Sequence, residues 1–274
     1  MIWRLIPFRT YNAFENMAMD EAIFRETVRN QKRPTLRFFG WRPAAVSIGY
    51  FQDMKNEIDL DRCRLSGVDV VRRITGGKAV YHFDEITYSL SAGRSEKLFP
   101  DQISLSYEKI SLCLARGLSF LGINARLAPP SHVIDSGKKP VRPANCFSAP
   151  SVNELTVDGK KICGSAQMRT RTGFLQHGSV LISFEPWETS RLILSPQTPD
   201  RLGASVTAVS DLVGSSVKAE ILAGFLQQGF KDELGVHFEE EPLTQEEEVL
   251  SCELRKKYES LSWNQERKAA APQR

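Results

Sequence analysis

The sequence has no uninterrupted apolar run of the roughly 18 residues that a helix needs to cross a bilayer. Residues 1–12 also hold too short an apolar stretch for a secretory signal peptide. An excess of one charge is missing as well, because 36 lysines and arginines against 33 aspartates and glutamates leave a net charge of only +3. Such a field is too weak for a general nucleic-acid binder. We therefore expect a cytoplasmic protein that binds neither membranes nor nucleic acids.

Cysteine is scarce and badly placed for cross-linking. The five cysteines are odd in number and scattered, with no CxxC pair and no Cys/His pair at metal-ligand spacing. This pattern argues against a disulfide framework and against a zinc site, and we expect neither a metal nor a bound cofactor. The choice that remains is between inert buried thiols and one reactive thiol.

The regular elements can be placed from periodicity and capping signals. A length of 274 residues favours one α/β domain with an accessory tail. Helices are predicted at 12–30, with Asn12 as the cap, at 105–121 and at 217–234. Thr244 begins a capping-box pattern ahead of a charged helix and a polar tail. Strands are predicted at WRLIP, TLRFF, AVSIG, VDVVRRI, EITYSLSA, VNELTV, KKICGSAQMR and FLQHGSVLISF.

Three segments could carry chemistry, and the first is VVRRITGGKAVYH at 70–82, where a strand runs into a Thr-Gly-Gly turn and out again. Adjacent glycines allow backbone N–H groups to approach a ligand oxygen closely. The segment matches neither GxGxxG nor GxxxxGK[ST], so it indicates neither a Rossmann nor a P-loop site. A plain glycine hairpin with Arg72 and Lys78 in solvent is an equal alternative.

The second segment, 158–181, begins with an Asp-Gly hairpin turn. In the strand after it Lys161 stands among small residues, which leaves room for a substrate. A solvated hairpin lysine is the alternative, and it is the commoner fate of lysine. His177, inside LQHGS, fits a satisfied core histidine better than an acid/base group.

The third segment, 129–150, is a long loop with five prolines and little periodicity that contains Cys146. Loops of this length inside a compact domain tend to be functional or disordered. Residues 138–173 carry seven basic and two acidic residues, and nearby cations favour the reactive thiolate form of a cysteine. Cys163 is the rival thiol, because it lies two residues from Lys161 on the same strand face.

Eight motifs occur in the order NMAMDEA, PTLRFFGW, SIGYFQ, VVRRITGGKAVYH, EITYS, CFSAPS, GKKICGSAQ and LQHGS. Together they resemble the lipoate and biotin protein ligase superfamily and, within it, the octanoyltransferases of lipoate assembly of the LipM type. The resemblance runs from about residue 3 to 241. It implies an α+β fold with a central, mixed but mostly antiparallel sheet flanked by helices. It also divides the chain into a catalytic domain, 1–241, and a charged C-terminal helix and tail, 242–274.

The resemblance also assigns roles to residues. Cys146, in CFSAPS, matches the cysteine that carries the octanoyl chain as a thioester, and Lys161 matches the lysine credited with lowering the pKa of that cysteine and holding the acyl carbonyl. The residues expected to bind substrate are Arg73, Gly76, Gly77, Lys78, His82, Gly164, Ser165, Ala166, His177 and Gly178. An apolar tunnel for the acyl chain is expected from Val71, Ala79, Tyr81 and Ala166.

Two positions depart from the pattern of the family. Lys78 replaces the third glycine that is usual in ATP-using lipoate ligases, and this favours a transferase. Phe83 replaces the aspartate that usually follows the histidine, which removes a polar group from the expected rim of the pocket. Whether Asp84 substitutes for that group is left open.

The implied activity is an acyl transfer, with octanoyl-acyl carrier protein as the donor and a lysine of a lipoyl domain as the acceptor. The acceptor domain would belong to the glycine cleavage H protein or to the E2 subunit of a 2-oxoacid dehydrogenase. An ATP-dependent lipoate-protein ligase and a non-catalytic protein that binds lipoyl domains are the alternatives. Whether an octanoylated glycine cleavage protein replaces the carrier protein as donor is left open, as is the oligomeric state.

Overall fold

The computed structural model describes residues 1–128, 154–194 and 197–267. Its strands are β1 Ile2–Tyr11, β2 Thr35–Trp41, β3 Ala45–Ile48, β4 Asp69–Arg72, β5 Val80–His82, β6 Glu85–Gly93, β7 Arg126–Leu127, β8 Leu155–Val157, β9 Lys160–Lys161, β10 Cys163–Arg169, β11 Gly173–Leu181 and β12 His237–Glu240. Its helices are α1 Ala13–Arg29, α2 Met54–Glu57, α3 Leu60–Leu65, α4 Ile103–Ser119, α5 Pro186–Leu192, α6 Pro199–Ser205, α7 Val209–Val213, α8 Ala219–Leu234, α9 Gln245–Glu259 and α10 Leu261–Glu266.

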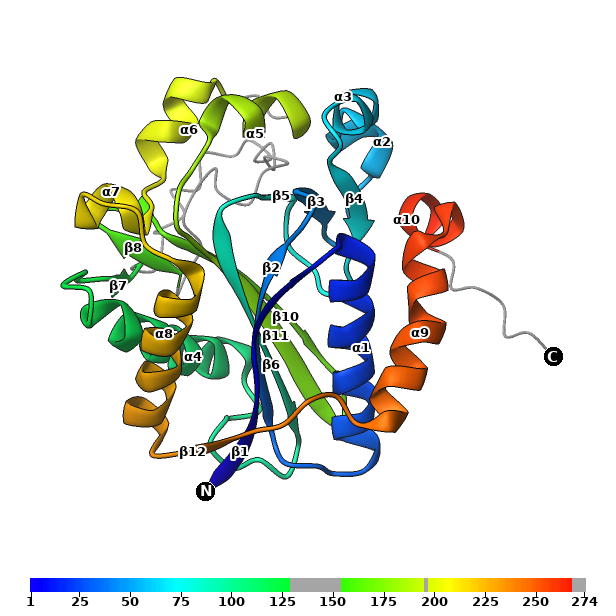
Figure 1. The fold of residues 1–274 in the computed structure, drawn as a ribbon, viewed down its shortest axis with the longest axis vertical. Helices are drawn as coiled ribbons and strands as arrows, with labels where there is room; N and C mark the ends of the chain where they lie inside the picture. The colour runs from blue at the N-terminus through cyan, green and yellow to red at the C-terminus, as the bar shows by residue number, and fades with distance from the viewer. Residues whose placement is uncertain (129–153, 195–196, 268–274) are drawn as a thin grey trace, which may run out of the picture.

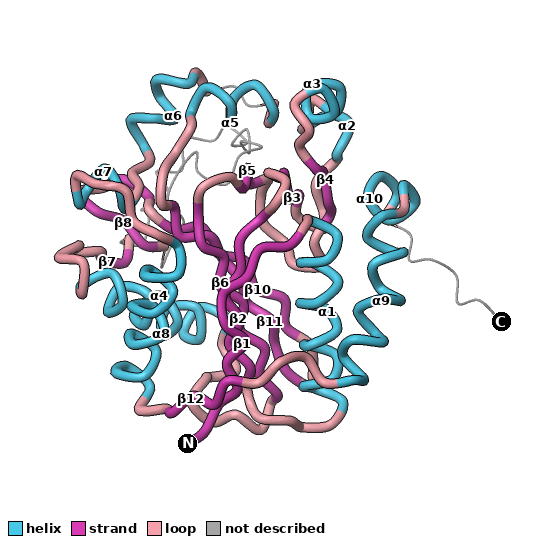
Figure 2. Tube along the Cα trace, viewed as in Figure 1, coloured by secondary structure: helices cyan, strands magenta, loops and turns pink. Residues whose placement is uncertain are grey.

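A six-stranded sheet with the order β10-β11-β6-β2-β1-β12 forms the centre of the molecule (Figure 2). β1 pairs in parallel with β2 and β12, whereas the other three pairings are antiparallel. Two three-stranded sheets, β4-β3-β5 and β7-β8-β9, stand beside it. The expected α+β fold with a mixed, mostly antiparallel sheet is confirmed.

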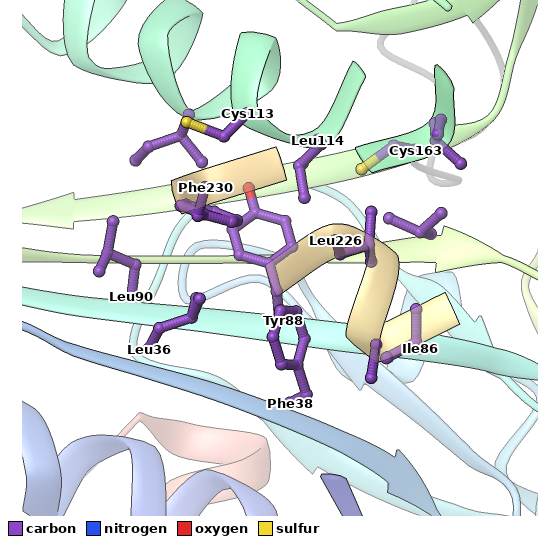
Figure 3. Close-up of a cluster of buried hydrophobic side chains, with 14 of the residues drawn as sticks. Leu36, Phe38, Ile86, Tyr88, Leu90, Cys113, Leu114, Cys163, Leu226 and Phe230 are labelled. Carbon is purple, nitrogen blue, oxygen red and sulfur yellow. The ribbon is translucent and has the colours of Figure 1, made fainter. Parts of the chain in front are cut away.

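Helices cover both faces of this sheet (Figure 1). α4 and α8 lie together on one face, and their apolar side chains join those of the sheet in the largest core cluster. α1 and α9 lie side by side on the other face. Figure 3 shows the first of these layers, where Tyr88 stands among Leu36, Phe38, Leu226 and Phe230.

Side chains alternate along β6 between two buried faces of the sheet, one apolar and one polar. Ile86, Tyr88 and Leu90 enter the core under α4 and α8, as the pattern predicts. The polar residues between them, which include Thr87 and Ser89, are also buried, because the opposite face lies under α1. The polar face of this strand is therefore a second interior rather than a solvated surface.

The predicted helix caps are confirmed by their hydrogen bonds. The backbone N–H of Glu15 donates to Asn12 Oδ1 over 2.9 Å, and the Glu15 carboxylate accepts from the backbone N–H of Asn12. Thr244 and Glu247 make the same reciprocal pair at the start of α9. Such boxes satisfy two donors that the first helical turn leaves free.

The C-terminal helices are tied to the sheet domain by buried polar contacts. Glu247 accepts two hydrogen bonds from the Arg4 guanidinium, at 2.8 and 2.9 Å, and both side chains are buried. In α10, Trp263 Nε1 donates to the backbone oxygen of Arg72, whose N–H donates to Asn264 Oδ1. Residues 245–266 thus pack against α1, β1 and β4. No helix among the described residues is long and apolar enough to cross a membrane.

The Arg4–Glu247 pair gives a stability prediction. Glu247→Gln should lower the free energy of unfolding by about 3 kcal/mol, because removing one partner of a buried pair leaves the other charge uncompensated. The midpoint of urea unfolding measures this loss. Glu248→Gln, at the exposed neighbouring position, is the matched control and should leave the midpoint unchanged; equal midpoints for the two variants would contradict the prediction.

Candidate active site

A cavity lies where strands β3, β5, β6, β10 and β11 meet α1. Seven of the ten residues expected to bind substrate line it, namely Arg73, His82, Gly164, Ser165, Ala166, His177 and Gly178. Six further residues complete the lining, namely Met17, Trp41, Ser47, Val80, Thr87 and Ser179. Segments far apart in the sequence therefore converge on one cavity.

Arg73 is the central side chain of this cavity and is almost fully buried. Its Nη1 donates to the backbone oxygen and the hydroxyl of Ser47, at 3.1 and 3.0 Å. Its Nε donates to Thr75 Oγ1 at 3.1 Å, and its Nη2 donates to the carbonyls of Gly76 and Lys78 at 2.9 and 2.8 Å. The planar guanidinium therefore joins β3 to the Thr-Gly-Gly turn.

The turn itself packs tightly against its surroundings. Gly77 has a φ of +92°, and a Cβ there would lie 2.8 Å from Arg73 Nη2. A Cβ on Gly49 would lie 2.0 Å from the carbonyl oxygen of Gly77. Gly76, Gly77 and Lys78 do not line the cavity among its described residues, because the carbonyls of this turn point to Arg73. The alternative with Arg72 in solvent is excluded, since that side chain is fully buried.

His82 connects a carboxylate to a hydroxyl. Its Nδ1 lies 2.8 Å from Glu85 Oε1, and its Nε2 lies 2.7 Å from Ser47 Oγ. The ring stacks on the indole of Trp41, with centroids 3.9 Å apart and planes inclined by 16°. The same Glu85 oxygen accepts from the hydroxyls of Thr87 and Ser179, at 2.6 and 2.7 Å.

His177 makes a second chain of the same kind. Its Nε2 lies 2.7 Å from Thr75 Oγ1, and its Nδ1 lies 3.2 Å from Asp20 Oδ2. Asp20 forms a buried ion pair of 2.7 Å with Arg37. Burial lowers the pKa of His177, and the hydrogen bond to Asp20 opposes this shift only in part. The imidazole is therefore held neutral, with both nitrogens occupied.

Lys161 is fully buried, and its Nζ lies 2.7 Å from Glu154 Oε1. The alternative of a solvated hairpin lysine is therefore wrong. Lys161 lies at the end of the hairpin β8-β9, outside the described lining of the cavity. Cys146 lies outside the described residues. Its rival Cys163 points into the core beneath α4 and α8 (Figure 3).

The chain matches the family model of the lipoyl protein ligase A/B catalytic domain over residues 12–231. The chain belongs to this family.

Relatives of known name match over nearly the whole chain. Octanoyltransferase LipM of Clostridioides difficile strain 630 is 37% identical over 97% of this chain and 99% of its own length. Octanoyltransferase LipM of Kyrpidia tusciae is 38% identical over 96% of this chain and 98% of its own length.

Solved structures of lipoate-protein ligases share the fold. Lipoate-protein ligase A bound with ATP has a TM-score of 0.79 at 29% identity and covers 97% of this chain and 99% of its own. The putative lipoate protein ligase Ta0514 of T. acidophilum with bound lipoic acid has the same TM-score at 27% identity, over 97% of this chain and 100% of its own.

The apolar wall of the cavity differs from the tunnel that was predicted from the sequence. Ala166 lines the cavity, but Val71 and Ala79 are buried in cores elsewhere. In β5 it is Val80 and His82 that face the cavity, and Tyr81 faces away because side chains alternate along a strand. The remaining apolar wall comes from Met17 and Trp41, which belong to the motifs NMAMDEA and PTLRFFGW but were not expected to line the tunnel.

The substitution at Phe83 lies away from the cavity. Phe83 is 57% exposed and stacks on Tyr81. Asp84 is exposed, and its carbonyl accepts from the backbone N–H groups of Ile182 and Ser183. Neither residue belongs to the lining, and the carboxylate that serves His82 is Glu85.

The motifs SIGYFQ, EITYS and NMAMDEA contain three polar residues of this site to which no role was assigned, namely Ser47, Glu85 and Asp20. The role of Glu85 could have been predicted from the sequence, because this residue follows His82 by three positions and begins the motif EITYS. Asp20 lies 157 residues from its partner His177, so no local pattern connects the two. Among the described residues no group of histidine, cysteine, aspartate and glutamate side chains could hold a metal ion.

The lowered pKa of His177 makes stability depend on pH. The unfolded chain binds a proton at this histidine below about pH 6.5, whereas the folded protein resists it. The stabilisation is therefore complete above that pH and is lost as the pH falls, by at most about 1.4 kcal/mol per pH unit. Urea unfolding measured between pH 7 and pH 5 should show that His177→Gln loses less free energy of unfolding than the parent does. His237→Gln, at an exposed position, is the control and should lose as much as the parent. An equal loss in His177→Gln and in the parent would refute the assignment.

Gly178 gives a packing prediction. A Cβ at this position would lie 2.3 Å from Ser165 Oγ, which hydrogen bonds to Tyr88. Gly178→Ala should therefore lower stability by about 1–3 kcal/mol, the usual cost of overpacking, as seen in the melting temperature. Gly224→Ala, in α8 with nothing within 4 Å, should instead stabilise by about 0.5–1 kcal/mol. A melting temperature that Gly178→Ala leaves unchanged would contradict the packing argument.

Proposed function

We propose that this chain is an octanoyltransferase of lipoate biosynthesis, which transfers an octanoyl group to a lysine of a lipoyl domain. The observation that carries this proposal is the match of 35–38% identity, over nearly the whole length, to proteins named octanoyltransferase LipM from several organisms. These alignments cover 96–97% of this chain and 98–99% of the relatives' own length.

The proposed reaction has two steps through Cys146. The thiolate attacks the octanoyl thioester of a carrier protein, so that a new C–S bond forms and the carrier thiol leaves. The ε-amine of the acceptor lysine then attacks the enzyme thioester, an amide forms, and the thiolate returns. Neither step needs a nucleotide, since a thioester is already activated. Acyl carrier protein as the donor and a glycine cleavage H protein or E2 domain as acceptors belong to this proposal.

Side chains in and near the cavity support this proposal. Met17, Val80 and Ala166 give it an apolar wall that suits a hydrocarbon chain, while Arg73 and His82 give it polar groups at fixed positions. Lys161, buried against Glu154, is proposed to favour the Cys146 thiolate. Gly77, in the turn outside the described lining of the cavity, is exposed, and its backbone N–H is proposed to bind the developing oxyanion.

A second candidate function is ATP-dependent lipoate ligation. It is favoured by the fold shared with lipoate-protein ligase A bound with ATP. This reaction would start from free lipoate and would need ATP but not Cys146. Assays with free lipoate plus ATP, and with octanoyl-carrier protein alone, separate the two functions.

The intact mass of the protein after mixing with octanoyl-acyl carrier protein, without ATP, tests the transferase directly. The parent should gain one octanoyl group, and peptide mapping should place it on Cys146. Cys146→Ala should gain none and should lose transfer to a lipoyl domain. Cys163→Ala, in the buried core, and the exposed Cys252→Ser should both still be acylated. Acylation of Cys163, or activity that requires ATP, would refute the proposal.

A further inference from the structure

A continuous hydrogen-bonded chain of a carboxylate, an imidazole and a hydroxyl runs along the cavity wall. Glu85 Oε1, His82 and Ser47 Oγ are joined by contacts of 2.8 and 2.7 Å. All three residues are at least nine-tenths buried, and His82 and Ser47 line the cavity. A base held by a third group and bonded to a hydroxyl is the arrangement with which enzymes move protons.

The hydrogen bonding around Ser47 leaves His82 able to hold or release a proton. Arg73 has donors only, so Ser47 Oγ must accept from it. When His82 is neutral with its proton on Nδ1, the Ser47 hydroxyl donates to Nε2. When His82 is protonated, the hydroxyl accepts from Nε2 instead, since its oxygen has two lone pairs. Both protonation states therefore keep every contact.

The carboxylate of Glu85 is directed at His82 and has no other cationic partner among the described residues. Within the described part of the chain, His82 is the sole ion-pairing partner of Glu85, and the second oxygen, Oε2, is buried without a hydrogen-bond partner. In the parallel chain Asp20 is already neutralised by Arg37. Burial also lowers the pKa of His177, which bonds to Asp20. The two histidines thus differ in their carboxylate partners, because Arg37 pairs with Asp20 whereas among the described residues no arginine or lysine pairs with Glu85.

We propose that the Glu85–His82–Ser47 chain receives the proton that the acceptor amine loses when it takes the octanoyl group. The inference rests on the proposed transferase function. The amine nitrogen forms a bond to the acyl carbon, the C–S bond breaks, and the thiolate keeps the electron pair. The amine proton passes to Ser47 Oγ while the hydroxyl proton passes to His82 Nε2, where Glu85 stabilises the cation. His82 later releases this proton to solvent.

Formation of the acyl-enzyme and transfer to the acceptor lysine can be measured separately, and this separates a proton-accepting role of His82 from a structural one. Formation of the acyl-enzyme needs no such acceptor, because the carrier thiol leaves as a thiolate. In single-turnover experiments His82→Gln should form the acyl-enzyme within about threefold of the parental rate and should slow transfer to a lipoyl domain by roughly 100-fold or more, the usual share of a general base. Ser47→Ala should show the same division. His237→Gln, an exposed histidine on β12, is the matched control with parental rates in both halves.

Hydroxylamine gives a second readout. It is an uncharged nucleophile at neutral pH, and in free solution its nitrogen can pass the proton that it loses to water or to a second hydroxylamine molecule. The octanoyl-enzyme of His82→Gln should therefore still release octanoyl hydroxamate at the parental rate. If hydroxylamine release and acylation fall together with lysine transfer, His82 has only a structural role and the proposal is overturned.

The pH profile tests Glu85, which is a positioning residue. The charged and titratable groups that face His82 are Glu85 from β6, Arg73 after β4 and His177 from β11. Glu85→Gln removes the negative charge that stabilises protonated His82, so the acidic limb of the transfer rate should move to lower pH. A lower rate with an unmoved limb would overturn this assignment.

These experiments distinguish a failure of the inference about His82 from a failure of the proposed transferase function. If the parental enzyme acquires no octanoyl group on Cys146, the two-step transfer fails, and the inference fails with it. If the parent is acylated and His82→Gln passes the group to lysine at the parental rate, only the inference fails.

Discussion

The candidate site depends on the buried Arg73 guanidinium, because this one side chain bonds both sides of the cavity at once. It holds Ser47 on β3 through Nη1 and Thr75 in the glycine turn through Nε. Each of these hydroxyls contacts one histidine, Ser47 that of β5 and Thr75 that of β11. A planar donor with five N–H groups can make these bonds together, and a lysine cannot. Both imidazoles are therefore linked, through one hydroxyl each, to the same cation.

The two imidazoles make similar hydrogen bonds, but the charges around their carboxylate partners differ. His177 bonds to a carboxylate whose charge Arg37 already balances, and burial keeps this histidine neutral. It holds the turn in place. His82 bonds to Glu85, for which the described residues provide no other ion-pair partner. The carboxylate beside His177 is therefore already paired with a cation, whereas the carboxylate beside His82 contacts only that imidazole and hydroxyl groups.

Local features of the fold could be predicted from sequence, because a cap or a turn depends on residues a few positions apart. The Asn12 and Thr244 caps and the Asp158-Gly159 hairpin are examples. Motif resemblance located Arg73, His82 and His177, but not what they bond to. Alternation in β6 identified its core face, yet buried and solvated polar faces look the same in a sequence. Asp20 and Ser47 lie inside the motifs NMAMDEA and SIGYFQ, but their roles could not be predicted, since contacts across the fold, rather than their neighbours in the chain, give them these roles.

The dependence of the site on Arg73 is tested most directly by NMR. The imidazole resonances of protein with ¹⁵N-labelled histidine are compared between the parent and Arg73→Lys. A single ammonium cannot hold Ser47 and Thr75 together, so the ring resonances of His82 and His177 should both shift while that of the exposed His237 stays in place. If only one of the two buried rings responds, or neither does, Arg73 does not couple the two chains and the account is contradicted.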